Sequence, residues 1–214
     1  NYVINTYTQP LGYSGIFPSP PQPGGDKLYC SILYNASTQN VVNAINDQRA
    51  LVTYSGHGST TGWAGPYLSQ TTCPSLVDND VFPFVASFAC ETNDFGNTTI
   101  PEVFGETWML AAHKGAIAYL GSADLSYWYE DDKLERVLYD TLLTSSTSTP
   151  SLGAAVFAGL NAVQIYYSGA AQYYWETYNL QGDPSTKMWT PTKPIIITPP
   201  PEEDFSTFLP LLQK

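Results

Sequence analysis

The amino-acid sequence predicts a single α/β domain with a mostly parallel central β-sheet. Three short apolar runs, at residues 50–54, 81–89 and 115–121, are typical of buried strands. Segments with apolar residues at helical spacing lie between and after these runs. Strands that alternate with helices in this way favour a layered arrangement in which helices pack on a parallel sheet.

The first part of the chain predicts little regular structure. Residues 1–26 are rich in Pro, Gly, Tyr and Ser, with four prolines at residues 18–23, and we expect an extended strap rather than a helix. The apolar run at residues 28–34 predicts a short strand. A helix then begins at Ser37 or Thr38, since either residue suits the N-cap. Its apolar positions are Val41, Val42 and Ile45.

The middle of the chain holds the most apolar predicted strand. The strand at residues 50–54 ends at a Ser-Gly-His-Gly sequence, and a polar loop follows to about Asp80. The run at residues 81–89 is apolar on both faces, as expected of a central strand between two layers of helices, and it ends at Cys90. Pro101 suits the first position of a helix, which we expect to run to about Ala111.

Three further elements complete the predicted domain. Residues 115–121 form a third buried strand, and residues 129–143 form a long helix with one apolar face. A helix rich in small residues runs from about residue 151 to 167. We therefore assign residues 27–189 to the domain. Residues 190–214, with six prolines, form an extended tail with an apolar tip.

The charge balance excludes one large class of partners. The chain has 8 Lys and Arg against 19 Asp and Glu, which gives a formal net charge of −11. So few cations cannot hold a phosphate backbone, and nucleic acid is therefore excluded. Charged residues make up 13% of the chain, about half the usual share, which favours an extracellular or cell-surface location. No apolar stretch is long enough to predict a membrane span.

Histidine and cysteine are scarce, which narrows the search for a reactive pair. The chain has 2 His and 3 Cys. His57 directly follows one predicted strand, between two glycines, and Cys90 directly follows the most apolar one. Because the carboxyl ends of parallel strands meet at one edge of a sheet, the two side chains converge if the strands are neighbours. An imidazole beside a thiol removes its proton and produces the nucleophilic thiolate.

Simpler interpretations stand beside this one. A buried cysteine at a strand end is most often inert packing, and a histidine in a glycine-rich turn is more often not catalytic. His113, next to Lys114 near a predicted helix end, fits a residue that stabilises the helix dipole. The sequence has no closely spaced pair of His or Cys ligands, so it predicts no metal site of that kind.

Several motifs follow one another along the chain. Residues 52–59 (VTYSGHGS) are followed by Trp63, and residues 83–90 (PFVASFAC) are followed by Asn-Asp-Phe. Three further segments are FGETW at residues 104–108, KGAIA at 114–118 with GS at 121–122, and YNLQGDP at 178–184. Together they resemble the histidine motif, the nucleophile motif and the later motifs of the gingipain-type (clan CD) cysteine peptidases. The resemblance covers about residues 27–189 and keeps the spacing between histidine and cysteine.

This resemblance implies a caspase-like fold, a three-layer α/β sandwich with a mostly parallel central sheet. It implies that His57 is the general base and acid and that Cys90 is the nucleophile. The backbone N–H groups of Gly58 and Cys90 are implied as donors to the oxyanion.

The resemblance also points to a specificity pocket. Trp128 and a turn at Gly121 and Ser122 fall where the family lines its primary substrate pocket; the other interpretation of Trp128 is a half-buried aromatic at a helix start. No cofactor is required. Family members bind calcium, and the acidic cluster at residues 130–132 is a candidate for it, with a solvated helix face as the alternative.

The chain departs from the family pattern before its histidine motif. In the family an upstream acid orients the imidazole, and members specific for Arg or Lys place another acid against the P1 side chain. Only Asp26 and Asp47 precede the motif here. We therefore expect an uncharged P1 preference, because a buried cation needs a carboxylate partner. The chain starts at Asn1 with no signal peptide, so we expect a processed fragment of a larger precursor. The missing N-terminal part is a separate chain after cleavage, or a backbone carbonyl replaces its role, or it is lost.

The first interpretation is a secreted or surface cysteine endopeptidase domain that hydrolyses peptide or protein substrates. The alternative is a structural or assembly subunit of an extracellular polymer or surface, built on the peptidase fold, with activity lost or residual. A transpeptidase would use the same residues.

Two remaining features of the sequence predict a disulfide and a docking segment. Cys30 and Cys73 are left as a pair, and in an exported protein a disulfide between them is a reasonable hypothesis, which makes Cys90 the only reactive thiol. The tail at residues 190–214 contains an Ile-Ile-Ile run of high β propensity. We expect the tail to dock on another copy of the chain or on the cell surface.

Overall fold

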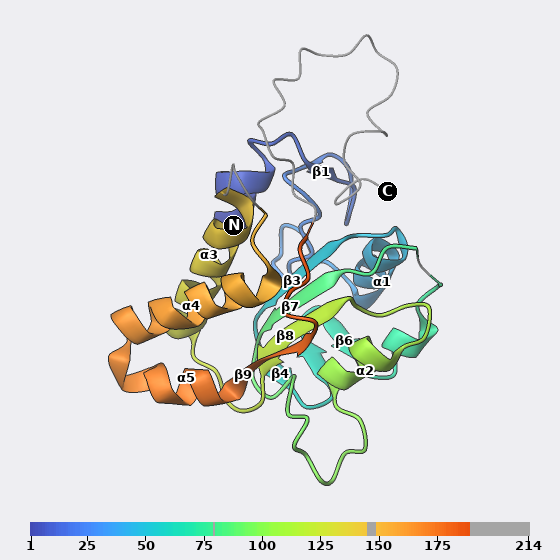
Figure 1. The fold of residues 1–214 in the computed structure, drawn as a ribbon. Helices are drawn as coiled ribbons and strands as arrows, with labels where there is room; N and C mark the ends of the chain where they lie inside the picture. Colours follow the sequence, from blue (N-terminus) through green and yellow to red (C-terminus); the bar gives the residue numbers. More distant parts are fainter. Residues whose placement is uncertain (79, 145–148, 189–214) are drawn as a thin grey trace.

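The computed structural model describes residues 1–78, 80–144 and 149–188. Within these ranges the chain folds around a four-stranded sheet with the order β3-β7-β8-β9 (Figure 1). Strands β3 (Leu51–Ser55), β7 (Phe84–Phe88) and β8 (Ala118–Ser122) are parallel, and β9 (Tyr178–Gly182) runs antiparallel to β8. The predicted α/β class with a mostly parallel sheet is confirmed. The predicted tail and its docking lie outside the described residues.

Helices cover both faces of the sheet (Figure 1). Helices α1 (Thr38–Asn46) and α2 (Phe104–Leu110) pack on one face, together with the inward side chains Val85 and Tyr119. Helices α3 (Trp128–Thr144) and α4 (Leu152–Tyr166) pack on the other. The short helix α5 (Ala171–Thr177) follows η3 (Ser168–Ala170) beside α4. The result is the three-layer arrangement expected of the sequence.

The central strand β7 explains this layering. All five of its residues are buried, because alternate side chains enter the two opposite cores. Phe84, Ala86 and Phe88 pack against α3 and α4, while Val85 faces α1 and α2. Helix α1 begins where predicted, since the Ser37 side chain accepts a hydrogen bond from the Asn40 N–H.

The N-terminal region differs from its prediction. Residues Ile4–Thr8 form a π-helical turn (η1), so the expected fully extended strap is wrong there. A hairpin with strands of two residues each follows, in which β1 (Ser14–Gly15) pairs antiparallel with β2 (Gln22–Pro23). The strand expected at residues 28–34 is also absent from the structure, because the apolar side chains Ile32 and Leu33 face solvent and the segment has no sheet partner.

Several boundaries and the strands β4, β5, β6 and β9 were not predicted. The expected polar loop after residue 55 contains a small antiparallel sheet, β4 (Gly58–Ser59), β5 (Gly62–Ala64) and β6 (Tyr67–Ser69), and a short 3-10 turn, η2 (Cys73–Ser75). Helix α2 starts at Phe104 rather than Pro101, since the Glu106 carboxylate accepts a hydrogen bond from the Val103 N–H and closes the helix start there. Strand β9 carries the YNLQG sequence that was noted only as a motif.

In the part of the chain that the structure describes, no helix is both long and apolar enough to cross a membrane.

One close helix contact gives a test of the packing. A Cβ atom at Gly159 of α4 would lie 2.9 Å from the Leu134 carbonyl oxygen of α3. We expect Gly159→Ala to lower the free energy of unfolding by about 1–3 kcal/mol, although alanine is the better helix former by about 1 kcal/mol. The measurement is urea denaturation followed by circular dichroism.

Gly169 supplies the matched control, because a Cβ atom there would meet nothing within 4 Å. Gly169→Ala should change the free energy of unfolding by less than about 0.5 kcal/mol. Equal effects of the two substitutions would contradict the close approach of α3 and α4.

Candidate active site

The register of β3 and β7 brings the predicted histidine and cysteine to the same edge of the sheet. Ser55 pairs with Phe88, and the Gly56 N–H donates a hydrogen bond of 3.2 Å to the Phe88 carbonyl. His57 and Cys90 each lie two residues beyond the paired residues Ser55 and Phe88. The two strands therefore end at the same sheet edge, and the loops that follow them carry His57 and Cys90.

Gly58 confirms how close the two loops lie. A Cβ atom on this glycine would approach the Thr92 Cγ2 atom to 2.7 Å, and both the Ala89 Cβ atom and the Cys90 carbonyl oxygen to 2.9 Å. Any larger residue would push the histidine loop away from the cysteine loop. The glycine after the histidine is thus a requirement of the contact between the loops.

The histidine loop is fixed through its backbone. The Tyr54 hydroxyl donates a hydrogen bond of 2.8 Å to the His57 carbonyl, and the Ala64 N–H donates another of 2.9 Å to the same oxygen. Tyr54 stacks on Trp63, with the ring centroids 4.5 Å apart. The His57 side chain itself is exposed, and within the described ranges its imidazole makes no hydrogen bond.

A buried polar chain connects the two loops beneath the surface. The Trp63 Nε1–H donates to the Ser87 hydroxyl at 2.9 Å, and Ser87 shares a hydrogen bond of 3.0 Å with the Thr92 hydroxyl. All three side chains are buried. Because each buried polar group has a partner, the chain holds the loops in one relative position.

The cysteine thiol rests against a third loop. The Ser126 N–H points at the Cys90 sulfur from 3.4 Å, and the Ser126 carbonyl lies 3.7 Å from the same sulfur. Glu91 has a φ of +57° and its N–H donates to the Asp124 carbonyl at 2.9 Å, so the chain turns sharply after the cysteine. The Cys90 side chain is half-buried. The loop that carries Ser126 therefore directs a backbone donor at the sulfur.

Asp131 anchors the loop that contacts the thiol. This carboxylate is 6% exposed and accepts hydrogen bonds from the hydroxyls of Ser126 (2.7 Å), Tyr174 (3.0 Å) and Tyr178 (2.5 Å). Burial raises the pKa of Asp131, while the three hydroxyl donors act in the opposite direction. Ser126 thereby links a buried acid to the sulfur of Cys90.

Asn93 closes the loop on its other side. Its side-chain amide donates to the Asn179 carbonyl at 2.9 Å and to the Gly121 carbonyl at 3.4 Å, and its oxygen accepts from the Gln181 amide at 2.5 Å. The side chain is fully buried. The segment after the cysteine is therefore tied to the ends of both β8 and β9.

Two backbone N–H groups of these loops have no acceptor among the described residues. The Ala64 N–H bonds the His57 carbonyl and Gly58 pairs with Trp63, a pattern in which the Gly58 N–H points away from β5. In the described part of the chain the Cys90 N–H has no hydrogen-bond partner. Both groups are thus available to an external acceptor.

The sequence pattern of peptidase family C25 matches residues 7–189. The chain belongs to this family. Lys-gingipain of Porphyromonas gingivalis is 30% identical over 204 residues, which cover 84% of this chain and 11% of that protein. Gingipain R1 of the same organism is 27% identical over 171 residues, which cover 75% of this chain and 17% of that protein. The chain therefore spans only a small part of the length of these relatives.

Solved structures agree with the C25 assignment. The crystal structure of the Arg-specific cysteine proteinase gingipain R superimposes with a TM-score of 0.65 and 26% sequence identity, over 71% of this chain and 36% of that chain. A complex of gingipain pro- and mature domains from Porphyromonas gingivalis gives the same TM-score at 25% identity, over 70% and 36% of the two chains. The caspase-like fold implied by the resemblance is confirmed.

The residues expected to line a specificity pocket differ in their exposure to solvent. Trp128 is the first residue of α3 and is 70% exposed, so it is not half-buried. Gly121 and Ser122 are the last two residues of β8, buried, and do not form the expected turn. The Ser122 hydroxyl donates a hydrogen bond of 2.9 Å to the Asp124 carbonyl.

The expected disulfide is absent from the structure. Cys30 and Cys73 are free thiols, the first exposed and the second fully buried in the core next to α2. Burial raises the pKa of Cys73 to about 12, so this thiol is unreactive. Cys30 is exposed, so thiol reagents can reach it as well as Cys90, and the prediction of a single reactive thiol is wrong.

The acidic residues named from the sequence have other roles. Asp26 and Asp47 both form ion pairs with Arg49, with N···O distances of 2.8 and 2.7 Å. Their carboxylates therefore bind Arg49 rather than the His57 imidazole. The cluster at residues 130–132 is not a solvated face throughout, because its middle residue is buried. Among the described residues, no group of three or more His, Cys, Asp and Glu side chains is arranged to hold a metal ion. Calcium binding stays a prediction.

Sequence reasoning missed the support beneath the cysteine. Ser126 and the two tyrosines that meet Asp131 carry no motif. The available signal was Asp131 itself, which precedes Leu134 and Leu138 by three and seven residues and thus shares their apolar helix face. An acid on such a face indicates a buried polar contact.

A pair of neighbouring aspartates tests this support. Asp131→Ala should lower the free energy of unfolding by about 2–4 kcal/mol, because it leaves buried hydroxyls without an acceptor. Asp132→Ala removes only an exposed pair with Arg136, with N···O at 2.7 Å, and should cost less than about 1 kcal/mol. Chemical denaturation of both variants is the measurement. Similar losses would show that Asp131 is not a structural anchor.

Proposed function

We propose that this chain is the catalytic domain of a cysteine endopeptidase in which Cys90 is the nucleophile and His57 the general base and acid. The observation that supports the proposal is the β3–β7 register, in which the strands that precede the two residues end at one sheet edge. Membership of family C25 and the gingipain relatives support the same chemistry.

The reaction follows from the groups at this edge. The His57 imidazole takes the proton of the Cys90 thiol, and the sulfur attacks the carbonyl carbon of a peptide bond. The N–H groups of Gly58 and Cys90 donate to the oxygen that becomes negatively charged. His57 returns the proton to the leaving amine as the C–N bond breaks, which leaves a thioester. Water, deprotonated by His57, then breaks the C–S bond and releases the acid.

The loop that carries Ser126 has a defined part in this scheme. Its N–H lies 3.4 Å from the Cys90 sulfur, and Asp131 keeps the loop in place through the Ser126 hydroxyl. Asp131 is therefore a positioning residue. Neither of the acids that precede the histidine motif supplies an orienting carboxylate, since Arg49 holds both. The backbone contacts of Tyr54 and Ala64 orient the histidine loop instead.

The substrate is a peptide or protein with an uncharged P1 side chain. The two acids that precede the histidine motif in this sequence, Asp26 and Asp47, are already paired with Arg49 and are not free to hold a P1 cation. We place the domain outside the cell or on its surface, as part of a longer precursor. The low charged content of the chain supports that location.

Hydrolysis of a quenched-fluorescence peptide library tests the proposal. Cys90→Ala and His57→Ala should each reduce kcat/KM by more than about 10³-fold, because each removes a group that acts in the chemical step. Cys30→Ala, at an exposed thiol outside this edge, should leave the rate within about twofold. Thiol-independent hydrolysis, or full activity of Cys90→Ala, would contradict the proposal.

A further inference from the structure

The segment formed by Leu125, Ser126 and Tyr127 (the 125–127 segment) makes a wall beside the Cys90 sulfur. Three atoms of Ser126 lie near this sulfur, the backbone nitrogen at 3.4 Å, the carbonyl oxygen at 3.7 Å and the hydroxyl oxygen at 4.0 Å. A shift of the segment would therefore change both the direction and the exposure of the thiol. The contacts that hold the segment bear directly on the proposed reaction.

Hydrophobic burial does not hold this segment. The side chains of Leu125 and Tyr127 are 50% and 51% exposed, and within the described ranges neither belongs to the two cores. Helix α3 fixes the end of the segment, since the Asp131 N–H donates to the Tyr127 carbonyl at 2.9 Å. The position of the remaining backbone therefore depends on hydrogen bonds from other elements.

Two consecutive tyrosines of α5 supply such hydrogen bonds. The Tyr173 hydroxyl donates a hydrogen bond of 2.8 Å to the Leu125 carbonyl. The Tyr174 hydroxyl accepts one of 2.9 Å from the Tyr127 N–H, and the Tyr127 carbonyl lies 3.1 Å from the same hydroxyl. The rings of Tyr127 and Tyr173 are also in contact, with centroids 6.1 Å apart. One helix thus holds the residues on both sides of Ser126.

The two hydroxyls lie in different environments. Tyr174 is fully buried, and its hydroxyl lies 3.0 Å from a carboxylate oxygen of Asp131, a charged acceptor that strengthens the contact. Tyr173 is half-buried. Burial and the nearby charge of Asp124 raise the pKa of Tyr173 to about 12, so this hydroxyl keeps the proton that it donates to Leu125.

Helix α5 is itself anchored on α4. The Trp175 Nε1–H donates to the Gln164 side-chain oxygen at 2.9 Å, and the ring of Trp175 meets the ring of Phe157 with centroids 5.4 Å apart. The two tyrosines are therefore carried by a packed helix. A hydroxyl at the end of a rigid ring on such a helix has little freedom to move.

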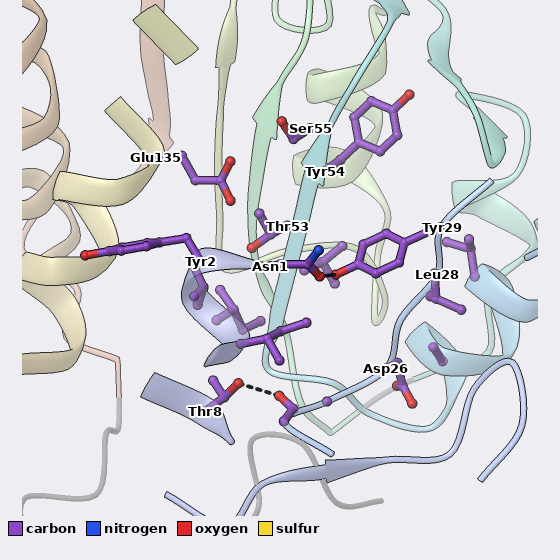
Figure 2. Close-up of a pocket in the computed structure, with 18 of the residues that line it drawn as sticks. Asn1, Tyr2, Thr8, Asp26, Leu28, Tyr29, Thr53, Tyr54, Ser55 and Glu135 are labelled. Atoms are coloured by element: carbon purple, nitrogen blue, oxygen red, sulfur yellow. Dashed lines mark hydrogen bonds between the residues drawn. The ribbon is translucent and has the colours of Figure 1, made fainter. Parts of the chain in front are cut away.

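The histidine side of the edge is held in the same way. Figure 2, a close-up of the cavity beside β3, shows Tyr54 on the side of the strand opposite Thr53. The Tyr54 hydroxyl donates to the His57 carbonyl at 2.8 Å. Tyrosine hydroxyls thus bind loop backbone on both sides of the candidate pair.

We propose that the hydroxyl groups of Tyr173 and Tyr174 are positioning groups for the peptidase reaction, which hold the 125–127 segment against the Cys90 sulfur and so set the direction of its attack. This inference rests on the proposed function of Cys90. Both tyrosines act through the segment rather than on the substrate. A small displacement of a reacting atom slows a reaction strongly, which gives such contacts a measurable effect on rate.

The position of the segment is measured by alkylation of Cys90 with a small and a bulky reagent, iodoacetamide and iodoacetanilide, in a Cys30→Ser background. The ratio of the two rates at one pH reports how closely the wall approaches the sulfur, because the ionised fraction of the thiol cancels. Tyr173→Phe and Tyr174→Phe should each raise the iodoacetanilide-to-iodoacetamide ratio at least about fivefold, as expected for loss of one hydrogen bond. Tyr166→Phe, at an exposed tyrosine of α4, should leave the ratio unchanged.

Tyr178→Phe separates the proposed contact from the support of Asp131. Tyr174 and Tyr178 both place a hydroxyl on this carboxylate, at 3.0 and 2.5 Å, whereas the Tyr174 hydroxyl also binds the backbone of Tyr127. We expect the ratio to rise at least about threefold more in Tyr174→Phe than in Tyr178→Phe. Equal ratios in these two variants, or an unchanged ratio in Tyr173→Phe, would overturn the proposal.

The third cysteine reports on the fold in the same experiment. Cys73 is fully buried, so its alkylation, located by peptide mapping, requires the core to open. The proposal predicts that Cys73 stays unlabelled while Cys90 reacts faster with the bulky reagent. Alkylation of Cys73 that rises in parallel with that of Cys90 would show a general loosening and would contradict a local role of the tyrosines.

Steady-state peptide hydrolysis tests the consequence for the reaction. Tyr173→Phe and Tyr174→Phe should each lower kcat about tenfold and change KM by less than about twofold, because a misdirected thiol slows the chemical step rather than binding. A loss confined to KM, or an unchanged kcat, would refute the positioning role. An inactive unsubstituted protein would instead refute the proposed function, and the alkylation ratios would still decide whether the tyrosines hold the segment.

Discussion

The parallel pairing of β3 with β7 is the constraint on which the candidate site depends. Five consecutive residue pairs fix the register from Leu51 and Phe84 to Ser55 and Phe88. A slip of one residue would exchange the side chains of β7 between the two cores, and both cores are closed. Hydrophobic burial therefore sets the relative position of the histidine and the cysteine, with no direct contact between the two side chains being required.

Polar contacts convert this register into a defined edge. On the histidine side the Tyr54 hydroxyl and the stacked Trp63 hold the loop backbone. On the cysteine side Asn93 ties the loop to β8 and β9. Each is buried and has its hydrogen-bond partners, and such groups favour one arrangement over the alternatives because an unpaired buried polar atom is costly.

Features that are visible in the local sequence were predicted well. The apolar runs gave β3, β7 and β8, because buried strands need continuous apolar residues, and the scarcity of His and Cys identified His57 and Cys90. The run at residues 28–34 misled because nothing in its local pattern reveals that Ile32 and Leu33 face solvent. Strand β9 was missed because it is short, polar and antiparallel, and depends on the partner strand β8.

The supporting contacts were missed for a related reason. The link from Asp131 through Ser126 to the cysteine joins three separate elements, and its geometry exists only after α3 has packed on the sheet. The free thiols show the same limit. Cys30 and Cys73 were paired by elimination, whereas folding buries one and exposes the other.

The central claim is that the sheet register makes His57 and Cys90 a functional pair. The most direct measurement is the rate of alkylation of Cys90 by iodoacetamide from pH 5 to 10, in a Cys30→Ser background, with and without His57→Ala. The account predicts that the Cys90 thiol is alkylated at the acidic end of this range when His57 is present and that His57→Ala removes this reactivity. Identical pH profiles for the two proteins would contradict it.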